Sequence, residues 1–477
     1  MKVLKNALWL AAGRTLADAA SFLLVIVISR HFGPPGTGEY SYAFALANLV
    51  GQLSAAGYEE YGIRAYACAA ESERRALWWR ILRTQALQLA LALIVFAVLL
   101  LSGIQGFARV TVVVELTIYY VGWCVARVLF IPCMALQQMR RPALIDLGCR
   151  LFAAGTAAAL IVTTGAPLPI ALLGFPLAGG ALILLSWRGG QRLAHLSRPN
   201  WSTAGTASLL REVFPFAASE LLYLFYARAD VLLIAFWLGA AGTGLYALNV
   251  KFVEMGLIPV ALLGSAVYPT LGRLAVARSP HLARAAQDFV HAGFLLTGWL
   301  AIGIAVVLPL LLVPVFGARF APAVPLLTLF AALALAKGAE TTLCRVLYSV
   351  GRQGAYVRNL GLGTVLIIAL NILLIPRFGL RGAAAAAVLS TLSVALACVY
   401  SLRSYVRPHR LAGAALRTGA ALALVAGANA IAQWQGLSAA PRALIAALLF
   451  PLAAFASGLV PSTRRGSLFG HTHGDLA

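Results

Sequence analysis

The sequence GPPGTGEY at residues 33–40 recurs as GAAGTGLY at residues 239–246, so both copies read GxxGTGxY with an offset of 206 residues. Each copy lies between two long apolar segments. Glycine adopts positive φ without steric cost, and each copy therefore predicts a tight turn between two helices. The residues assigned to these turns are Gly33, Gly36, Gly38 and Tyr40 in the first copy and Gly239, Gly242, Gly244 and Tyr246 in the second.

The composition around these turns is that of a membrane protein. Of the 477 residues, 61% are hydrophobic and 11% are charged, whereas soluble domains carry about 25% charged residues. A helix needs about 20 apolar residues to cross a hydrocarbon layer roughly 30 Å thick, and such segments recur along the whole chain. A large soluble helical repeat protein would instead show a charged outer face on its helices. The sequence therefore predicts an all-α, polytopic membrane protein.

Fourteen transmembrane helices are predicted, with twelve as the alternative count. Arg14 and Asp18 interrupt what would be the apolar core of a cleaved signal peptide, so the first segment is expected to remain as a span. In the first half the predicted spans are 9–30, 41–63, 84–103, 111–135, 143–164 and 168–187. In the second half they are 212–238, 245–267, 289–315, 323–349, 357–375, 382–402, 414–434 and 442–460.

The net charge of +22 does not indicate nucleic-acid binding, because the basic residues follow the loops. If the spans alternate in direction, 24 of the 37 Lys and Arg residues lie in the loops and termini of one side. The other side holds six: Arg30, Arg109, Arg319, Arg377, Arg381 and Arg442. Basic loops stay in the cytoplasm, so both termini are predicted to be cytoplasmic. Attraction to anionic phospholipid head groups is a second role for this charge.

The two copies of the turn are separated by six spans, so they have the same orientation and form a parallel repeat about the membrane normal. The tyrosine that ends each copy is expected to anchor at the membrane surface. The repeat predicts two pseudo-symmetric six-helix lobes facing a cavity. The expected domains are an N-terminal lobe at 1–190, a cytoplasmic linker at 191–211, a C-terminal lobe at 212–405, and a helix pair with a cytoplasmic tail at 406–477.

Three stretches resemble a known family: Arg14–Leu16 through Ile28–Gly33 to Gly57, Arg228–Ile234 before the second turn, and Asn371–Ala384. They resemble the polysaccharide biosynthesis (O-antigen flippase) branch of the superfamily that also contains multidrug and toxin extruders (MATE transporters) and the lipid II flippase. The resemblance covers roughly residues 6–402.

This resemblance implies a MATE-like fold and a function. Such a flippase moves undecaprenyl-diphosphate-linked oligosaccharide by alternating access from the cytoplasmic to the outer leaflet of the bacterial inner membrane. The glycan would be an O-antigen, capsule or exopolysaccharide unit, and the implied partner proteins are a polysaccharide polymerase and a chain-length regulator. In relatives, an extra helix pair such as the one expected at 406–477 can border a groove for the lipid tail.

Ionisable side chains inside the predicted spans form the candidate site. Each costs on the order of 3 kcal/mol at mid-span unless it has a partner or water, and a diphosphate needs charge-assisted donors such as the planar fork of arginine. The candidates for substrate binding in the cavity are Arg14, Arg127, Arg228, Lys251, Lys337 and Arg345. The candidates for ion coupling or charge pairing are Asp18, Glu220, Asp230, Glu254 and Glu340.

Spacing leaves open whether these charges contact substrate or one another. Arg14 and Asp18 share one face of the first span, and the repeat offset aligns Arg14 with Glu220, so that a pair across the cavity is a further option. Two other pairs, Lys251 with Glu254 and Lys337 with Glu340, have the i, i+3 spacing of pairs within one helix. The driving force is open between Na⁺, H⁺ and the membrane potential.

Other classes of function fit the sequence less well. A membrane glycan ligase or polymerase would need a large external loop for its active site, and the outer loops expected here have about a dozen residues at most. The chain contains no GxxxxGKS/T, HExxH or paired CxxC motif, so no catalytic residue, cofactor or metal is assigned. A cation or drug antiporter would favour an acidic cavity, and a lipid II flippase would carry more arginines in its first helix; both are kept as alternatives.

Overall fold

The structure is a computed structural model that describes residues 2–104, 106–194, 206–406, 408–436 and 438–456. Most of the predicted linker and nearly all of the predicted cytoplasmic tail lie outside these residues. Every regular element in the described part of the chain is a helix. The all-α fold class predicted from the sequence is therefore confirmed.

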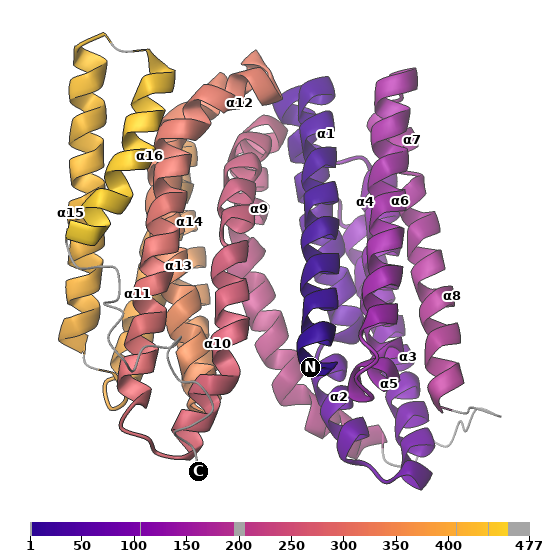
Figure 1. Cartoon of the computed structure of the whole chain (residues 1–477). Helices are drawn as coiled ribbons and strands as arrows, with labels where there is room; N and C mark the ends of the chain where they lie inside the picture. Colours follow the sequence, from indigo (N-terminus) through magenta and orange to yellow (C-terminus); the bar gives the residue numbers. More distant parts are fainter. Residues whose placement is uncertain (1, 105, 195–205, 407, 437, 457–477) are drawn as a thin grey trace. The chain divides into compact units, whose positions relative to one another are not determined.

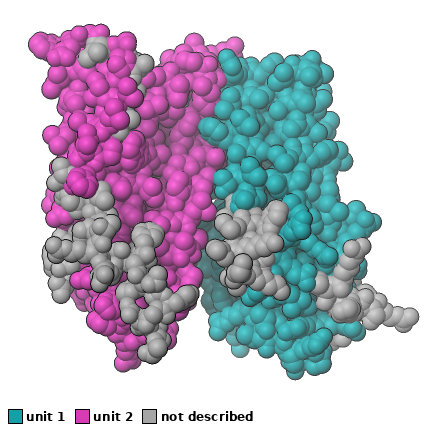
Figure 2. Space-filling model, viewed as in Figure 1, with its two compact units in different colours: residues 1–247 teal, residues 248–477 magenta. Residues whose placement is uncertain are grey.

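Residues 1–247 and 248–477 form two compact units, which Figure 2 colours separately. In the first unit, α1 lies against α4 and α6, and α8 lies against the same two helices (Figure 1). The helices of this unit are α1 (Lys2–Ala55), α2 (Tyr58–Cys68), α3 (Glu71–Leu101), α4 (Val110–Leu129), α5 (Ile131–Ala135), α6 (Arg140–Thr164), α7 (Leu168–Ala171), α8 (Gly174–Ala194) and most of α9 (Thr206–Gly256).

The second unit is built around α13, which lies against α10, α11 and α14, while α15 lies against α11 and α16. Its helices after α9 are α10 (Ile258–Val276), α11 (Leu282–Ile302), the π-helix η1 (Gly303–Val307), α12 (Leu308–Phe316), the 3₁₀-helix η2 (Ala318–Leu326), α13 (Leu327–Ser349), α14 (Gln353–Ser401), α15 (Pro408–Trp434) and α16 (Ala439–Ala456).

Ten helical segments of the described chain are long and apolar enough to cross a membrane. Three of them contain 49 residues or more, which at 1.5 Å per residue would be about twice the length that one crossing needs. Each of these three contains a glycine with positive φ where the helix is interrupted: Gly33, Gly239 and Gly379. Counted on both sides of these glycines, the ten segments supply thirteen crossings, and α16 is a further, shorter apolar helix. This count agrees with the fourteen spans expected from the sequence.

The two copies of GxxGTGxY have the same backbone. The first glycine has φ 68° and ψ −165° at Gly33, and φ 65° and ψ −164° at Gly239. In both copies the threonine four residues later donates its hydroxyl to that glycine's carbonyl oxygen, at 2.9 Å from Thr37 and 2.8 Å from Thr243. Glycine tolerates this left-handed conformation, and the hydroxyl supplies a donor to a carbonyl at the interrupted helix. The Gly and the Thr that recur four residues apart in both copies are thus joined by a hydrogen bond from the threonine hydroxyl to the glycine carbonyl.

The third glycines of the two copies meet. A Cβ atom on Gly38 would lie 1.8 Å from the carbonyl oxygen of Ala240, and one on Gly244 would lie 2.0 Å from that of Pro34. The offset of 206 residues maps Gly38 onto Gly244 and Pro34 onto Ala240, so each contact is the counterpart of the other. Reciprocal contacts of this kind are those of a two-fold relation. Within the first unit, the two turns therefore pack backbone to backbone with no room for a side chain.

The tyrosines that end the two turns are not surface anchors. Tyr40 is 6% exposed and Tyr246 is fully buried. The hydroxyl of Tyr246 donates to Asp230 Oδ2 at 2.7 Å, and a buried carboxylate needs such donors. The expectation of anchoring at the membrane surface was wrong, because these rings are enclosed by the protein.

The outward faces of the helices suit a lipid environment. In α3 the most apolar window of 18 residues has a mean hydropathy of 2.3, yet only 17% of it is buried. Leu87, Leu91, Ile94, Val98 and Leu101 follow one helical face and are 58–88% exposed. A bare stripe of this size is unfavourable in water and favourable in hydrocarbon, where each such residue stabilises insertion by about 0.3–0.6 kcal/mol.

Replacing Gly38 or Gly244 by alanine is expected to destabilise the protein, because the added methyl group would overlap a carbonyl oxygen of the opposite turn. Each variant should lower the melting temperature in detergent, at a cost of about 1–3 kcal/mol. The double variant should cost less than the sum, since one displacement makes room for both methyl groups. The control is Gly155→Ala on α6, where an added Cβ meets nothing within 4 Å. Strictly additive losses would contradict the reciprocal contact.

Candidate substrate site

Charged side chains of the first unit form a connected network. It draws on α1, α2, α4, α6 and α9, which supply side chains far apart in the sequence. On α4, Trp123 and Arg127 are four residues apart, and on α6 so are Asp146 and Arg150. This spacing places each pair on one face of its helix.

Arg127 contacts two carboxylates. Its Nε lies against Glu59 Oε2 on α2, and its Nη1 lies 3.3 Å from Glu220 Oε1 on α9. Glu220 also accepts a hydrogen bond from the backbone N–H of Gly57 at 2.9 Å. Gln52 Oε1 lies 3.4 Å from Arg127 Nη1. One guanidinium therefore joins α2, α4 and α9.

Arg150 is held in the same way by two other carboxylates. Its Nη1 lies 3.2 Å from Asp18 Oδ1 on α1, and its Nε lies 3.3 Å from Asp146 Oδ1 on its own helix. The first unit thus contains two triads, each an arginine between two acids.

Trp123 lies between the two triads. The centroid of its ring is 5.0 Å from Cζ of Arg127 and 5.3 Å from Cζ of Arg150. Its indole N–H donates to Asp146 Oδ1 at 2.9 Å. Cation–π contacts contribute about 0.5–2 kcal/mol each, more where water is excluded. The ring therefore couples the positions of the two guanidinium groups.

The two triads contain more acids than bases. Four carboxylates face two guanidinium groups, and the six side chains are 18–34% exposed. Carboxylates in excess of guanidinium groups are costly in a membrane protein unless a cation compensates them. The network can also exchange its carboxylates for another anion that competes for the arginines.

Arg14 and Asp18 do not pair with each other. The carboxylate of Asp18 is bound by Arg150, and Arg14 is an exposed side chain for which the described part of the chain gives no hydrogen bond or ion pair. The suggested pair of Arg14 with Glu220 is also not formed, because Arg127 and the Gly57 amide occupy Glu220. Arg14 thus differs from Arg127, whose guanidinium is engaged by two carboxylates.

Arg228 and Asp230 lie close to the glycine turns. Cζ of Arg228 is 5.3 Å from the ring centroid of Phe44. Asp230 is 7% exposed and accepts hydrogen bonds from the hydroxyl of Tyr246 and the backbone N–H of Val231, both at 2.7 Å. The structure places Asp230 among the packing contacts of the second turn.

The remaining predicted residues belong to the second unit, where each lysine pairs with an acid three residues along its own helix. Lys251 Nζ lies 2.9 Å from Glu254 Oε2, and Lys337 Nζ lies 2.8 Å from Glu340 Oε2. Cζ of Arg345 is 6.0 Å from the ring centroid of Tyr268. The predicted site residues therefore fall into two groups, one in each unit.

Two residues of the network, Glu59 and Trp123, were missed from the sequence, and Asp146 and Arg150, although charged residues of a predicted span, were not among the candidate site residues. Two signals were available. Glu59 lies within the predicted span 41–63, and Asp146 and Arg150 have i, i+4 spacing within the predicted span 143–164. Among the residues that the structure describes, no group of three or more His, Cys, Asp or Glu side chains is arranged to hold a metal ion.

Solved structures of known proteins share this architecture. The sequence profile of the polysaccharide biosynthesis protein family matches residues 3–275. No curated protein sequence matches the chain at a significant level. Among solved structures, the lipid II flippase MurJ in its inward closed conformation is similar with a TM-score of 0.73 and 12% identity, over 94% of this chain and 98% of that chain.

Two transporters are similar over a smaller part of the chain. An inward-facing multidrug resistance MATE family transporter of the MOP superfamily has a TM-score of 0.62 and 13% identity, over 84% of this chain and 95% of that chain. A mutant MATE transporter of Vibrio cholerae has a TM-score of 0.53 and 17% identity, over 84% and 97%. Identities this low concern the fold alone, and the MATE-like fold expected from the sequence is confirmed.

Removing the guanidinium between Glu59 and Glu220 should destabilise the first unit, because two carboxylates would then face each other. We expect Arg127→Met to lower the melting temperature in detergent, with a cost of about 1–3 kcal/mol after allowance for partial exposure. Adding Glu59→Gln and Glu220→Gln to Arg127→Met should recover most of the loss. Arg127→Met behaving like wild type would show that the triad adds nothing to stability.

Proposed function

We propose that this chain, which belongs to the polysaccharide biosynthesis protein family, is a flippase for undecaprenyl-diphosphate-linked oligosaccharide. The cargo would be an O-antigen, capsule or exopolysaccharide repeat unit, moved by alternating access from the cytoplasmic to the outer leaflet of the bacterial inner membrane. The role is transport without a catalytic step. A polysaccharide polymerase and a chain-length regulator would act on the same lipid-linked glycan.

The observation that carries this proposal is the pair of arginines beside Trp123, inside helices whose outer faces are apolar. A diphosphate is recognised by charge-assisted hydrogen bonds, and a guanidinium forms two of them in one plane. Arg127 and Arg150 supply two such groups, held in position by the same ring. The chemistry of the network therefore suits an anionic head group carried through a membrane.

Transport requires that the arginines be released from their carboxylates. In the structure each guanidinium is engaged by two acids. A diphosphate must compete with them, and protonation of one carboxylate, or binding of Na⁺ to it, would weaken the competition. We infer that the surplus acids couple cargo binding to a cation, and that Arg14, exposed and without a carboxylate partner in the described chain, makes the first contact with the diphosphate.

A cation or drug antiporter is the second candidate, and one observation favours it. The network holds four acids and two arginines, which is a composition that attracts cations. Efflux of a cationic dye separates the two functions. An antiporter predicts dye efflux that depends on Asp18 and Glu220, whereas the flippase predicts that glycan display depends on the arginines and that dye efflux is absent.

The test of the flippase uses Arg14. In a strain lacking the gene, Arg14→Ala is expected to reduce surface glycan display at least about tenfold, a change of about 1.4 kcal/mol, while the protein accumulates normally because no carboxylate loses its partner. Arg14→Lys should restore display only in part, since a point charge does not replace the planar fork. The control is Arg319→Ala, at an exposed arginine of η2. Normal display with Arg14→Ala would remove Arg14 from the mechanism.

The direction of transport depends on the orientation, which the loop charges predict. Single cysteines in a cysteine-free background should resist a membrane-impermeant thiol reagent in whole cells at Ala70 and Ala277, and react at Ser102. All three positions are exposed on the protein, so protection would report the membrane and not burial. Labelling at Ala70 and Ala277 but not at Ser102 would reverse the topology and the direction of flipping.

A further inference from the structure

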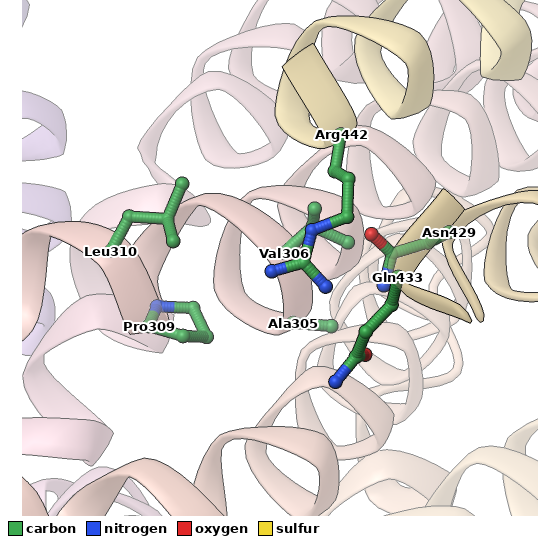
Figure 3. Close-up of a pocket in the computed structure, with 7 residues that line it drawn as sticks. All are labelled: Ala305, Val306, Pro309, Leu310, Asn429, Gln433 and Arg442. Atoms are coloured by element: carbon green, nitrogen blue, oxygen red, sulfur yellow. The ribbon is translucent and has the colours of Figure 1, made fainter. Parts of the chain in front are cut away.

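A cavity of about 200 Å³ opens in the second unit, where η1 and α12 face α15 and α16 (Figure 3). Val306, Pro309 and Leu310 form its apolar side. Its polar side comes from Asn429 and Gln433 on α15 and from Arg442 on α16. This volume is far larger than a single water molecule needs.

Two polar atoms of this lining are buried without a hydrogen-bond partner among the described residues: Arg442 Nε and Asn429 Oδ1. Gln433 follows Asn429 by four residues and therefore lies on the same face of α15. A buried polar group without a partner costs about 1–3 kcal/mol, and more when it is charged. The lining thus contains donors and an acceptor that a polar ligand would satisfy.

Across the cavity from α15 and α16, the backbone of η1 and the start of α12 departs from a regular α-helix. In η1 the N–H of Leu308 bonds to the carbonyl of Gly303, five residues back instead of four, and the next residue, Pro309, has no N–H. The helical turn that contains Pro309 therefore lacks one backbone N–H donor. Single π-helical turns are frequent at functional sites, and this one borders the cavity.

The charge of the cavity lining favours an anionic ligand. Among the described residues that line the cavity, Arg442 carries the charge and none is an acid. Arg442 therefore differs from Arg127 and Arg150 of the first unit, each of which contacts two carboxylates. A guanidinium together with two carboxamide groups matches the oxygens of a phosphate. The apolar side contributed by Val306, Pro309 and Leu310 matches hydrocarbon next to that phosphate.

The position of the cavity fits the head-group region of a bilayer. Gln433 lies next to Trp434, which ends α15 and is 88% exposed. Exposed tryptophans are enriched at the membrane–water interface. Arg442 lies in the first turn of α16, the helix that follows α15. The cavity is thus at the end of the helix pair where lipid phosphates are found.

We propose that this cavity binds the phosphate of a phospholipid head group, and that the lipid fastens the α15–α16 pair to η1 and α12. The phosphate accepts a hydrogen bond from Arg442 Nε, a hydroxyl of the head group donates to Asn429 Oδ1, and the lipid chain covers the apolar side. This inference does not depend on the transported cargo, because it concerns a resident lipid. The ligand shares its phosphate chemistry with inorganic phosphate and with a polyprenyl diphosphate, so the test has to separate the three.

The experiment measures lipid binding to the purified full-length protein by native mass spectrometry and by thermal shift. Phosphatidylglycerol added to the detergent should form a bound adduct and raise the melting temperature, and inorganic phosphate at millimolar concentration should do neither. Arg442→Gln should weaken binding at least about tenfold, with Arg442→Lys intermediate because it lacks the planar fork. Arg381→Gln, at an exposed arginine of α14, is the matched control and should bind as wild type does.

Three results would overturn the proposal. Equal phosphatidylglycerol binding by Arg442→Gln and by wild type would place the lipid elsewhere. Stabilisation by inorganic phosphate alone would make the cavity an anion site without a lipid. Undecaprenyl phosphate or diphosphate displacing phosphatidylglycerol, together with loss of glycan display in Arg442→Gln, would assign the cavity to the cargo. If Arg442→Gln does not accumulate, Asn429→Ala removes the buried acceptor and provides the same comparison.

Discussion

The hydrocarbon core of a bilayer offers no hydrogen bonds, so each polar group of this chain that lies within it must find a partner in the protein. The backbone meets this constraint by being helical wherever the structure describes regular elements. Interruptions occur at glycines, and at Gly33 and Gly239 a threonine hydroxyl returns to the glycine carbonyl. Where η1 and Pro309 leave a turn one donor short, the structure has a cavity with polar side chains opposite.

The same constraint governs the close approach of the two glycine turns. With little hydrophobic force between helices inside a membrane, small residues that let backbones touch are a main source of helix association. Gly38 and Gly244 bring the two copies of the repeat to a separation that a methyl group would prevent. The contact also explains why the second copy belongs to the compact unit formed by residues 1–247, although it follows the first by 206 residues.

The charges obey the constraint in two different ways. In the second unit, Lys251 and Lys337 each bind an acid three residues along the same helix, which neutralises charge without joining helices. In the first unit, Arg127 and Arg150 bind acids on other helices and share the ring of Trp123. A ligand or proton that changes one of these contacts alters the packing of several helices at once. That property suits the first unit to a transport cycle.

The sequence by itself determined the membrane-spanning helical fold and the duplicated turns, because hydropathy and glycine conformation are local properties that need no knowledge of neighbours. It also located most of the intramembrane charges, including Arg127 and Glu220. Only the tertiary structure decided their partners: Asp18 binds Arg150 instead of Arg14, Glu220 binds Arg127, and Tyr246 is buried against Asp230. The partner of a buried charge is set by which helices pack side by side, and helical spacing along one segment carries no record of that arrangement.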